Sequence, residues 1–432
     1  MSTLESLYIR DYRLLWLGQV STSMGQWMDQ VTRGYLMYQL TGGNAFDVGA
    51  VTAARGLPLL LFGIIAGALA DRSGRKAQLV IAQVTNAILN ALLATLVITG
   101  LVQPWHVYVT AFLAGTVQAF QQPARQTLVS DIVGNDKLMN ALALNSAALN
   151  GSRVLGPGIS GALIVFLGVS KSYYLQAVMY LIATIWTLQM VVPEPHSDRA
   201  DRGRESFWAS ISSGLVYVAK QKNIRAQLIL ALGPLTFGMS YTAMMPIIAL
   251  TVLHGTAQTQ GLLLSCIGVG ALSGALIVAS MKRDYAYGLT VVIGAIAFCI
   301  GVFMFASSHW IWLSCILGAI LGTFSVTYTT QDQTLLQVSA PRNIRGRVMS
   351  IFLLNRGTVP IGALLAGTLA QLYGGQNSLH IMAVLGLLTI GLVVATNPGI
   401  LTLKVPLKTD EDAERDRAAS TAPPVTAERA TG

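Results

Sequence analysis

The chain has 432 residues, of which 53% are hydrophobic and only 11% charged, and its mean hydropathy is +0.58. A soluble domain carries about 25% charged residues, so this composition excludes most soluble enzymes, disordered scaffolds and nucleic-acid-binding proteins. Because a membrane-spanning helix needs roughly 20 apolar residues and a short connection, the length can hold about a dozen spans and little else. The sequence therefore predicts an integral membrane protein.

Apolar runs separated by turns and charges predict an all-α fold of twelve transmembrane helices in two pseudo-symmetric six-helix bundles. The first six helices are expected at residues 14–39, 46–70, 77–100, 105–124, 139–167 and 172–192. The second six are expected at residues 224–252, 258–280, 286–307, 309–331, 347–371 and 379–402.

These helices divide the chain into an amino-terminal bundle (1–192), a cytoplasmic linker (193–223), a carboxy-terminal bundle (224–402) and a tail (403–432). Within the linker, residues Phe207 to Lys220 have apolar positions at helical spacing, which indicates an interfacial amphipathic helix. The tail is charged and rich in Ala, Ser, Thr and Pro, so it is expected to be disordered.

Two short matches between the halves are consistent with a duplicated six-helix unit. The segments 153–157 and 356–360 share the pattern Arg-x-x-x-Pro. Upstream of each, the triplet Gln-Thr-Leu occurs at 126–128 and at 333–335.

The basic residues predict the orientation in the membrane. Of the 28 Lys and Arg residues, Lys171 falls on one side of the membrane, four arginines lie within the helices, and all the others fall on the opposite side. Arg125 is counted with this last set, as a residue that follows the fourth helix. Because basic residues collect in cytoplasmic loops, both termini are expected to be cytoplasmic, in a multi-pass protein of the cytoplasmic membrane. The first 13 residues lack the apolar core of a cleavable signal peptide, so the first helix is expected to stay in the mature protein.

The connection between helices two and three combines a turn glycine with an acid and several bases. Its notable residues are Gly67, Asp71, Arg72, Gly74, Arg75 and Lys76. The acid can accept hydrogen bonds from a helix amino terminus and the bases can bind carboxylates or lipid phosphates, so this cluster could latch the two halves together. The alternative is a simple turn with cytoplasmic positive charge.

This connection resembles the signature G-x-L-a-D-r-x-G-r-k of the major facilitator superfamily. Further resemblance comes from residues 122–126, from Gly156-Pro157 and from residues 345–349. Together these segments make the chain similar to the branch of the superfamily that includes the enterobactin exporter and related efflux permeases. The resemblance implies that helices one, four, seven and ten line a central cavity, and Arg347 joins the expected latch. Some family members pair the base after the motif acid with an acid on helix four. Residues 105–124 contain no acid, and Asp131 is the nearest substitute.

The fifth helix carries a glycine-proline motif formed by Gly156, Pro157 and Gly161. It resembles the motif of proton-coupled antiporters in the superfamily, although Ser160 replaces a glycine of that pattern. Small residues also permit close helix packing and proline bends a helix, so an antiport role and a packing role both remain open.

Ionisable residues inside a membrane are costly and are functional candidates by default. Asp29 is the one deep carboxylate of the predicted helices, with Asp332 at the inner end of helix ten and Asp47 at the outer mouth of helix two. Arg33 follows Asp29 by four residues on the same helical face, and Arg55 could reach Asp29 across the helix hairpin. This trio is predicted to mediate proton coupling, and a permanent ion pair is the alternative.

One deep acid against four deep arginines makes the helical interior net positive, which favours anionic or hydrogen-bond-accepting substrates. Candidate substrate contacts are Gln26, Gln30, Gln118, Arg153, Tyr241, Tyr328 and Arg356. Each of these could instead form interhelical hydrogen bonds.

These features predict a monomeric secondary transporter that works by alternating access in the lipid bilayer and exports a small organic molecule, siderophore-like metabolite or drug, with proton antiport as the driving reaction. The alternatives are a proton-coupled importer or uniporter of an anionic metabolite, and a non-transporting membrane sensor or scaffold. No phosphate-binding loop, metal-ligand spacing or catalytic constellation occurs in the sequence, so we expect no enzyme activity, cofactor, metal or nucleic-acid partner.

Overall fold

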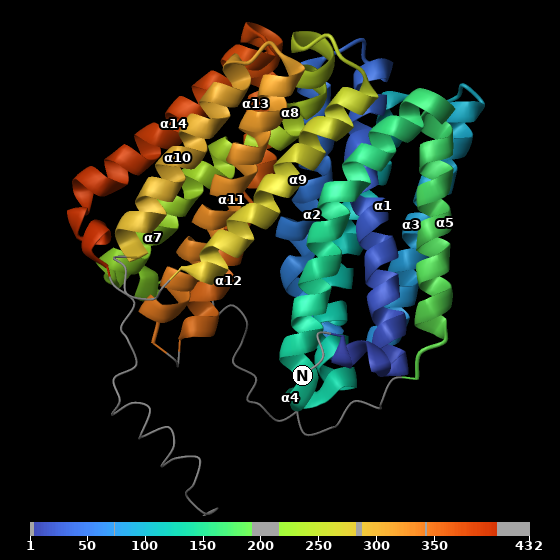
Figure 1. The fold of residues 1–432 in the computed structure, drawn as a ribbon, viewed down its shortest axis with the longest axis horizontal. Coiled ribbons are helices and arrows are strands. Elements are labelled where there is room, and N and C mark those ends of the chain that lie inside the picture. Colours follow the sequence, from blue (N-terminus) through green and yellow to red (C-terminus); the bar gives the residue numbers. More distant parts are fainter. Residues whose placement is uncertain (1–3, 73, 192–215, 282–286, 342–343, 404–432) are drawn as a thin grey trace, which may run out of the picture.

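The computed structural model describes residues 4–72, 74–191, 216–281, 287–341 and 344–403 (Figure 1). Within these ranges the regular secondary structure is entirely helical. Figure 1 shows α1 to α5, in blue to green, beside α7 to α14, in yellow-green to red. We call these sets the first and the second helix group.

The first helix group follows the predicted segments closely. After a short turn at Glu5–Tyr8 it comprises α1 (Arg10–Leu40), α2 (Ala45–Arg72), α3 (Arg75–Ile98), α4 (Pro104–Leu167) and α5 (Val169–Leu188).

The helix α4 covers both the fourth and the fifth predicted helix. The two parts are separated by Gly134, whose positive φ of 72° interrupts the helical backbone, a conformation that glycine adopts without a steric penalty. The prediction that the fourth helix ends at residue 124 is wrong, because α4 continues past it and Arg125 is a helical residue that is only 4% exposed.

The second helix group contains interrupted helices. Residues 222–252 form one path through α7 (Lys222–Leu232), two short turns, α8 (Tyr241–Ile247) and a last turn at Ile248–Val252. The remaining members are α9 (Ala257–Ser280), α10 (Tyr287–Ser307), α11 (Ile311–Ser339), α12 (Arg345–Arg356), α13 (Val359–Tyr373), α14 (Gly375–Thr396) and the turn at Pro398–Thr402.

The apolar surface fits a lipid environment. In the part of the chain that the structure describes, seven helical segments are long and apolar enough to cross a membrane: 45–63, 75–98, 222–252, 257–280, 287–307, 311–339 and 375–396. Large side chains such as Leu388 and Leu392 are exposed on the outside of the bundle, where water would oppose such a surface. Twelve spans in two bundles therefore remain a prediction, while an all-helical membrane fold is established.

Two equivalent turns are consistent with the predicted duplication. Gly168 alone separates α4 from α5, with φ 87° and ψ 166°, and Gly374 alone separates α13 from α14, with φ 86° and ψ 157°. Both glycines have a left-handed φ that disfavours a side chain. The same one-residue connection thus occurs before the last helix of each group.

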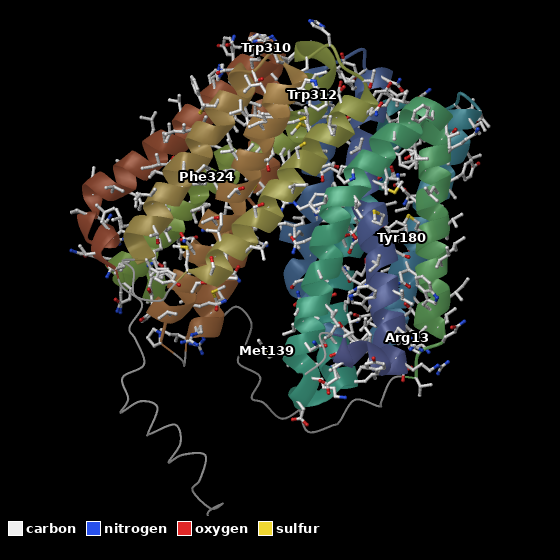
Figure 2. The ribbon with its side chains drawn as sticks, in the orientation of Figure 1. Arg13, Met139, Tyr180, Trp310, Trp312 and Phe324 are labelled. Atoms are coloured by element: carbon white, nitrogen blue, oxygen red, sulfur yellow. The ribbon has the colours of Figure 1, made fainter. Side chains whose placement is uncertain are left out.

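The two helix groups pack together mainly near one end. A Cβ on Gly49 would lie 2.5 Å from the carbonyl oxygen of Ala363, and one on Gly161 would lie 2.6 Å from that of Ala257, so glycine permits these close contacts. The Tyr38 hydroxyl also lies 3.1 Å from the Thr251 hydroxyl. This packed end carries Trp310 and Trp312, whereas Arg13 and Met139 mark the opposite end, which we call the basic end (Figure 2).

The predicted linker and tail fall largely outside the described residues. Residues 192–215, with most of the proposed interfacial helix, and residues 404–432, with almost all of the tail, are not among them. Residues 216–220, the last part of the proposed interfacial helix, are helical.

Candidate functional site

A buried ion-pair cluster lies in the first helix group. Arg33 donates to both carboxylate oxygens of Asp29, from Nη2 at 2.9 Å and from Nε at 3.1 Å. Arg55, from α2, donates from Nη1 to the same carboxylate. Asp29 and Arg33 are 3% and 4% exposed, so the sequence correctly identified three side chains that meet.

The helix α4 holds Arg33 in place. Nη1 of Arg33 donates to Oγ1 of Thr110 at 2.9 Å and to the carbonyl oxygen of Val107 at 3.3 Å. The Arg33 guanidinium therefore has partners besides Asp29, whereas the Arg55 side chain is 21% exposed. Arg55 is consequently the member of the cluster that is most free to change its partner.

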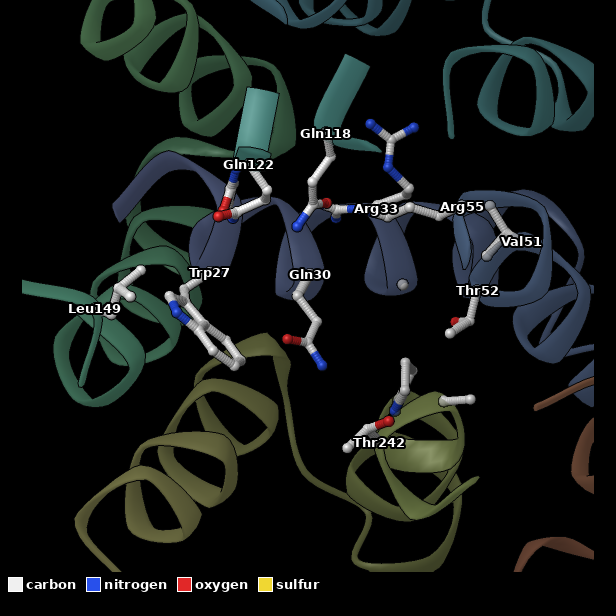
Figure 3. Close-up of a pocket in the computed structure, with 14 residues that line it drawn as sticks. Trp27, Gln30, Arg33, Val51, Thr52, Arg55, Gln118, Gln122, Leu149 and Thr242 are labelled. Atoms are coloured by element: carbon white, nitrogen blue, oxygen red, sulfur yellow. The ribbon is translucent and has the colours of Figure 1, made fainter. Parts of the chain in front are cut away.

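A cavity of about 360 Å³ opens beside this cluster, between the two helix groups. Its wall comes from α1, α2, α4 and α8 and includes the two arginines and four glutamines. The lining residues are Gln26, Trp27, Gln30, Arg33, Gly34, Val51, Thr52, Arg55, Gln118, Gln122, Leu149, Thr242, Ala243 and Pro246. Figure 3 shows Trp27 and Gln30 projecting from α1 towards the second helix group, where Thr242 lies, with Gln118 and Gln122 on the α4 side.

The charge and the donors of this cavity suit an electron-rich ligand. Two guanidinium groups line it, and Asp29 beneath them supplies one compensating negative charge. The surplus positive charge attracts anions, and glutamine amides can both donate and accept hydrogen bonds. Trp27 adds a flat apolar surface on which a ring can stack.

The predicted substrate contacts divide into two sets. Gln26, Gln30 and Gln118 line the cavity together. Arg153 does not, but its guanidinium stacks 5.5 Å from the centre of the Trp27 ring, and so it holds one cavity wall.

The other three predicted contacts do not meet at the cavity. Tyr241 is buried next to it, and its hydroxyl faces Arg153. Tyr328 stacks on Phe298 inside the second helix group. Arg356 ends α12 and is exposed, away from the lining residues.

The glycine-proline motif of the fifth predicted helix forms a close packing face. A Cβ on Gly156 would lie 2.8 Å from Cβ of Trp27, and Gly161 faces the start of α9. The Pro157 carbonyl oxygen would lie 2.3 Å from a Cβ on Gly261. These contacts explain the small residues by packing, and they place the motif where α4 meets both α1 and the second helix group.

The predicted latch residues lie at the basic end, where α2 gives way to α3. Of Gly67, Asp71 and Arg72 the structure describes the backbone alone, in α2, while Gly74 precedes the first turn of α3. Asp131 of α4, the substitute acid that the sequence suggested for the base after the motif acid, forms an ion pair with Arg75.

The other two bases of the predicted latch lie on different helix groups. Lys76 donates to the carbonyl oxygens of Leu188 and Met190 at 2.8 and 2.7 Å, and Arg347 lies on α12. The partners of Arg75 and Lys76 thus all belong to the first helix group and the residues directly after it.

Sequence reasoning missed several residues of the site. Trp27 of α1 lines the cavity, as do Val51 and Thr52 of α2, a helix that was not among those expected there, and Thr110 anchors Arg33. Thr52 could have been found, because it precedes Arg55 by one helical turn on the same face. Trp27 and Thr110 carry no sequence signal that separates them from ordinary membrane residues.

Comparisons with known proteins agree with this architecture. Residues 1–429 match the family described as transmembrane secretion effector. The staphyloferrin A transporter of Staphylococcus aureus is 24% identical, over 84% of this chain and 90% of that protein. The multidrug efflux pump Tap of Mycolicibacterium fortuitum is 28% identical, over 85% and 90%. The enterobactin exporter EntS of Salmonella typhi is 26% identical, over 82% and 84%.

The fold is also that of solved transporters. A bacterial homologue of the human lysosomal transporter Spinster, in an inward-facing and unoccupied conformation, superposes with a TM-score of 0.73 at 12% identity. The match covers 94% of this chain and 99% of that one. The chain therefore belongs to the transmembrane secretion effector family of the major facilitator superfamily and is a multi-pass membrane transporter of small molecules, not an enzyme.

Proposed function

We propose that this transporter exports small organic anions or neutral polar molecules rich in hydrogen-bond acceptors, such as siderophore-like metabolites or drugs, in exchange for protons. The observation that carries the proposal is the cavity beside the Asp29 cluster, lined by Arg33, Arg55 and four glutamines. The relatives named above, two of them siderophore transporters and one a drug efflux pump, support the same class of cargo.

The packing of the helix groups supports an inward-facing state. Their close contacts lie near the end that carries Trp310 and Trp312, and their ribbons diverge towards the basic end (Figure 1). Basic residues mark the cytoplasmic side of membrane proteins, so we assign the basic end to the cytoplasm. In this state the cavity would load cargo from inside the cell, as an exporter requires.

The Asp29 cluster supplies a means of coupling. Arg55 faces the cavity and also binds Asp29, so an anionic substrate and Asp29 compete for the same guanidinium. When substrate draws Arg55 away, Asp29 loses one of its two counter-charges and accepts a proton more readily. Rocking of the two helix groups, closed at the basic end by the latch residues Asp71, Arg72 and Arg347, would then exchange proton and substrate across the membrane.

Reconstituted proteoliposomes test this proposal. The cargo screen compares organic anions (citrate and 2,3-dihydroxybenzoate), a neutral polar compound (inosine) and a lipophilic cation (ethidium) under an imposed pH gradient. We expect anion or neutral transport with substrate-dependent proton flux, abolished in Asp29→Asn and retained in the control Asp136→Asn, since Asp136 is exposed. Transport of ethidium with the anions ignored would overturn the cargo class, and proton flux unaltered in Asp29→Asn would remove Asp29 from the coupling.

A further inference from the structure

A second buried carboxylate lies in the second helix group, far along the chain from the Asp29 cluster. Asp332, on α11, is 2% exposed. Its Oδ1 atom has no hydrogen-bond partner among the described residues, and the ion pairs found in those residues involve Asp29, Asp131 and Glu5 instead.

The surroundings of Asp332 are apolar. One turn earlier, Tyr328 is 1% exposed, stacks on Phe298 and has a hydroxyl without a partner. One turn later, Leu336 packs in a core cluster with Leu228 and Phe352. A carboxylate with this burial is shielded from solvent, and among the described residues no arginine forms an ion pair with it.

The helices packed against α11 offer no counter-charge to Asp332 within the described residues. α9 and α10 contribute Cys266, Cys299 and Tyr287 as titratable groups, and none of these carries a positive charge. Lys222 and Arg225 of α7 and Arg345 of α12 are exposed at the basic end, and Arg347 of α12 is half-buried. None of these bases forms an ion pair with Asp332.

Burial of an unpaired charge is so costly that the group takes up a proton instead. Asp332 therefore differs from Asp29, which two arginines hold in the charged form. It lies about 10 Å from the end of α11 at the basic end, at the usual rise per residue, so a modest rearrangement would bring water to it.

We propose that Asp332 is a second proton-binding residue, which holds a proton in the conformation described here and releases it to water when the helix groups rearrange. Protonation joins the carboxylate to a proton from hydronium and leaves water, and release reverses that step. This inference rests on the proposed proton exchange and adds a coupling residue to it, in the helix group that lacks Asp29.

Infrared difference spectroscopy of the full chain in liposomes tests the protonation without any substrate. At neutral pH we expect a carboxylic-acid carbonyl band that disappears as the pH is raised. The band should be absent from Asp332→Asn, shifted but present in Asp332→Glu, and unchanged in the control Asp136→Asn. A band of the same size in Asp332→Asn, or no such band in the wild type, would overturn the inference.

Transport measurements test the coupling, with the organic anion that gives the strongest signal in the cargo screen as the probe. Each coupled proton supports an about tenfold substrate gradient per pH unit imposed. Asn mimics a protonated Asp, so Asp332→Asn should fold and exchange substrate, yet its accumulation should fall about tenfold per pH unit, and Asp332→Glu should restore it.

The outcomes separate this inference from the proposed function. Wild-type protein without substrate-dependent proton flux would refute the exchange itself, whereas wild-type flux that persists in Asp332→Asn would refute only the role of Asp332. If Asp332→Asn does not fold, the infrared titration of the wild type and the coupling of Asp332→Glu still test the proposal. A folded Asp332→Glu protein that shows the carboxylic-acid band but has lost proton coupling would contradict it.

Discussion

Replacing Asp29 with Asn should destabilise the fold far more than a typical Asp-to-Asn change. Asp29 accepts two hydrogen bonds from Arg33 and one from Arg55 at a site that is 3% exposed. The change removes the one negative charge and leaves two guanidinium groups facing each other.

The magnitude follows from the burial of the cluster. Removing one partner of a buried ion pair costs about 3–5 kcal/mol. The Asn carbonyl can still accept one bond, and Thr110 and Val107 still hold Arg33, so we expect about 3 kcal/mol, the lower end of that range. In Asp47→Asn, the matched control, only the bond from the Tyr108 hydroxyl at 2.6 Å is at stake, and we expect about 1 kcal/mol.

Chemical unfolding in mixed micelles, followed by tryptophan fluorescence, measures these free energies. The variants Asp29→Asn, Arg33→Gln and their combination form a double-mutant cycle, and the double variant should be more stable than the sum of the singles predicts by about 1–3 kcal/mol. If Asp29→Asn costs no more than Asp47→Asn, or if the cycle is additive, the cluster is not the buried ion pair described here.

Three further changes test other parts of the account. Thr110→Val should lower the free energy of unfolding by about 1.5 kcal/mol, because Nη1 of the charged Arg33 keeps only its longer bond to Val107; an unchanged unfolding curve would contradict this. Gly161→Leu should separate the two helix groups at the packed end, since a Cβ on Gly161 would lie 2.6 Å from the Ala257 carbonyl oxygen. Cysteine labelling from the outside should therefore increase, and labelling equal to that of the wild type would refute the packing role. Asp71→Asn should shift the inward to outward balance in side-specific labelling, and identical labelling would count against the latch.

Local sequence signals were sufficient to predict the Asp29 cluster. The spacing of Asp29 and Arg33 puts them on one helical face, and the tight connection to the next helix brings Arg55 to the same depth. Charges inside apolar runs are rare enough to be informative. Helix ranges were also predictable from hydropathy, with deviations at interrupted segments such as residues 222–252.

Tertiary packing determined what the sequence could not show. Arg125 was placed after the end of the fourth helix, yet α4 continues through Pro123 and buries it. Asp332 looked like the end of helix ten, whereas α11 runs on to Ser339. In both cases the helix continues beyond its apolar stretch through polar residues, so hydropathy alone placed its end too early. Whether a charged side chain is buried depends on the neighbouring helices, which no local sequence pattern encodes.

The central claim is that Arg55 presents a positive charge to substrate in the cavity. Binding of the preferred organic anion to Arg55→Gln, measured by calorimetry on the purified protein, tests it most directly, with Arg225→Gln as the control because Arg225 is exposed at the start of α7. A hydrogen bond to a charged group contributes about 1.5–3 kcal/mol, so Kd should rise about 10- to 100-fold in Arg55→Gln and stay unchanged in Arg225→Gln. Wild-type affinity in Arg55→Gln would contradict the account.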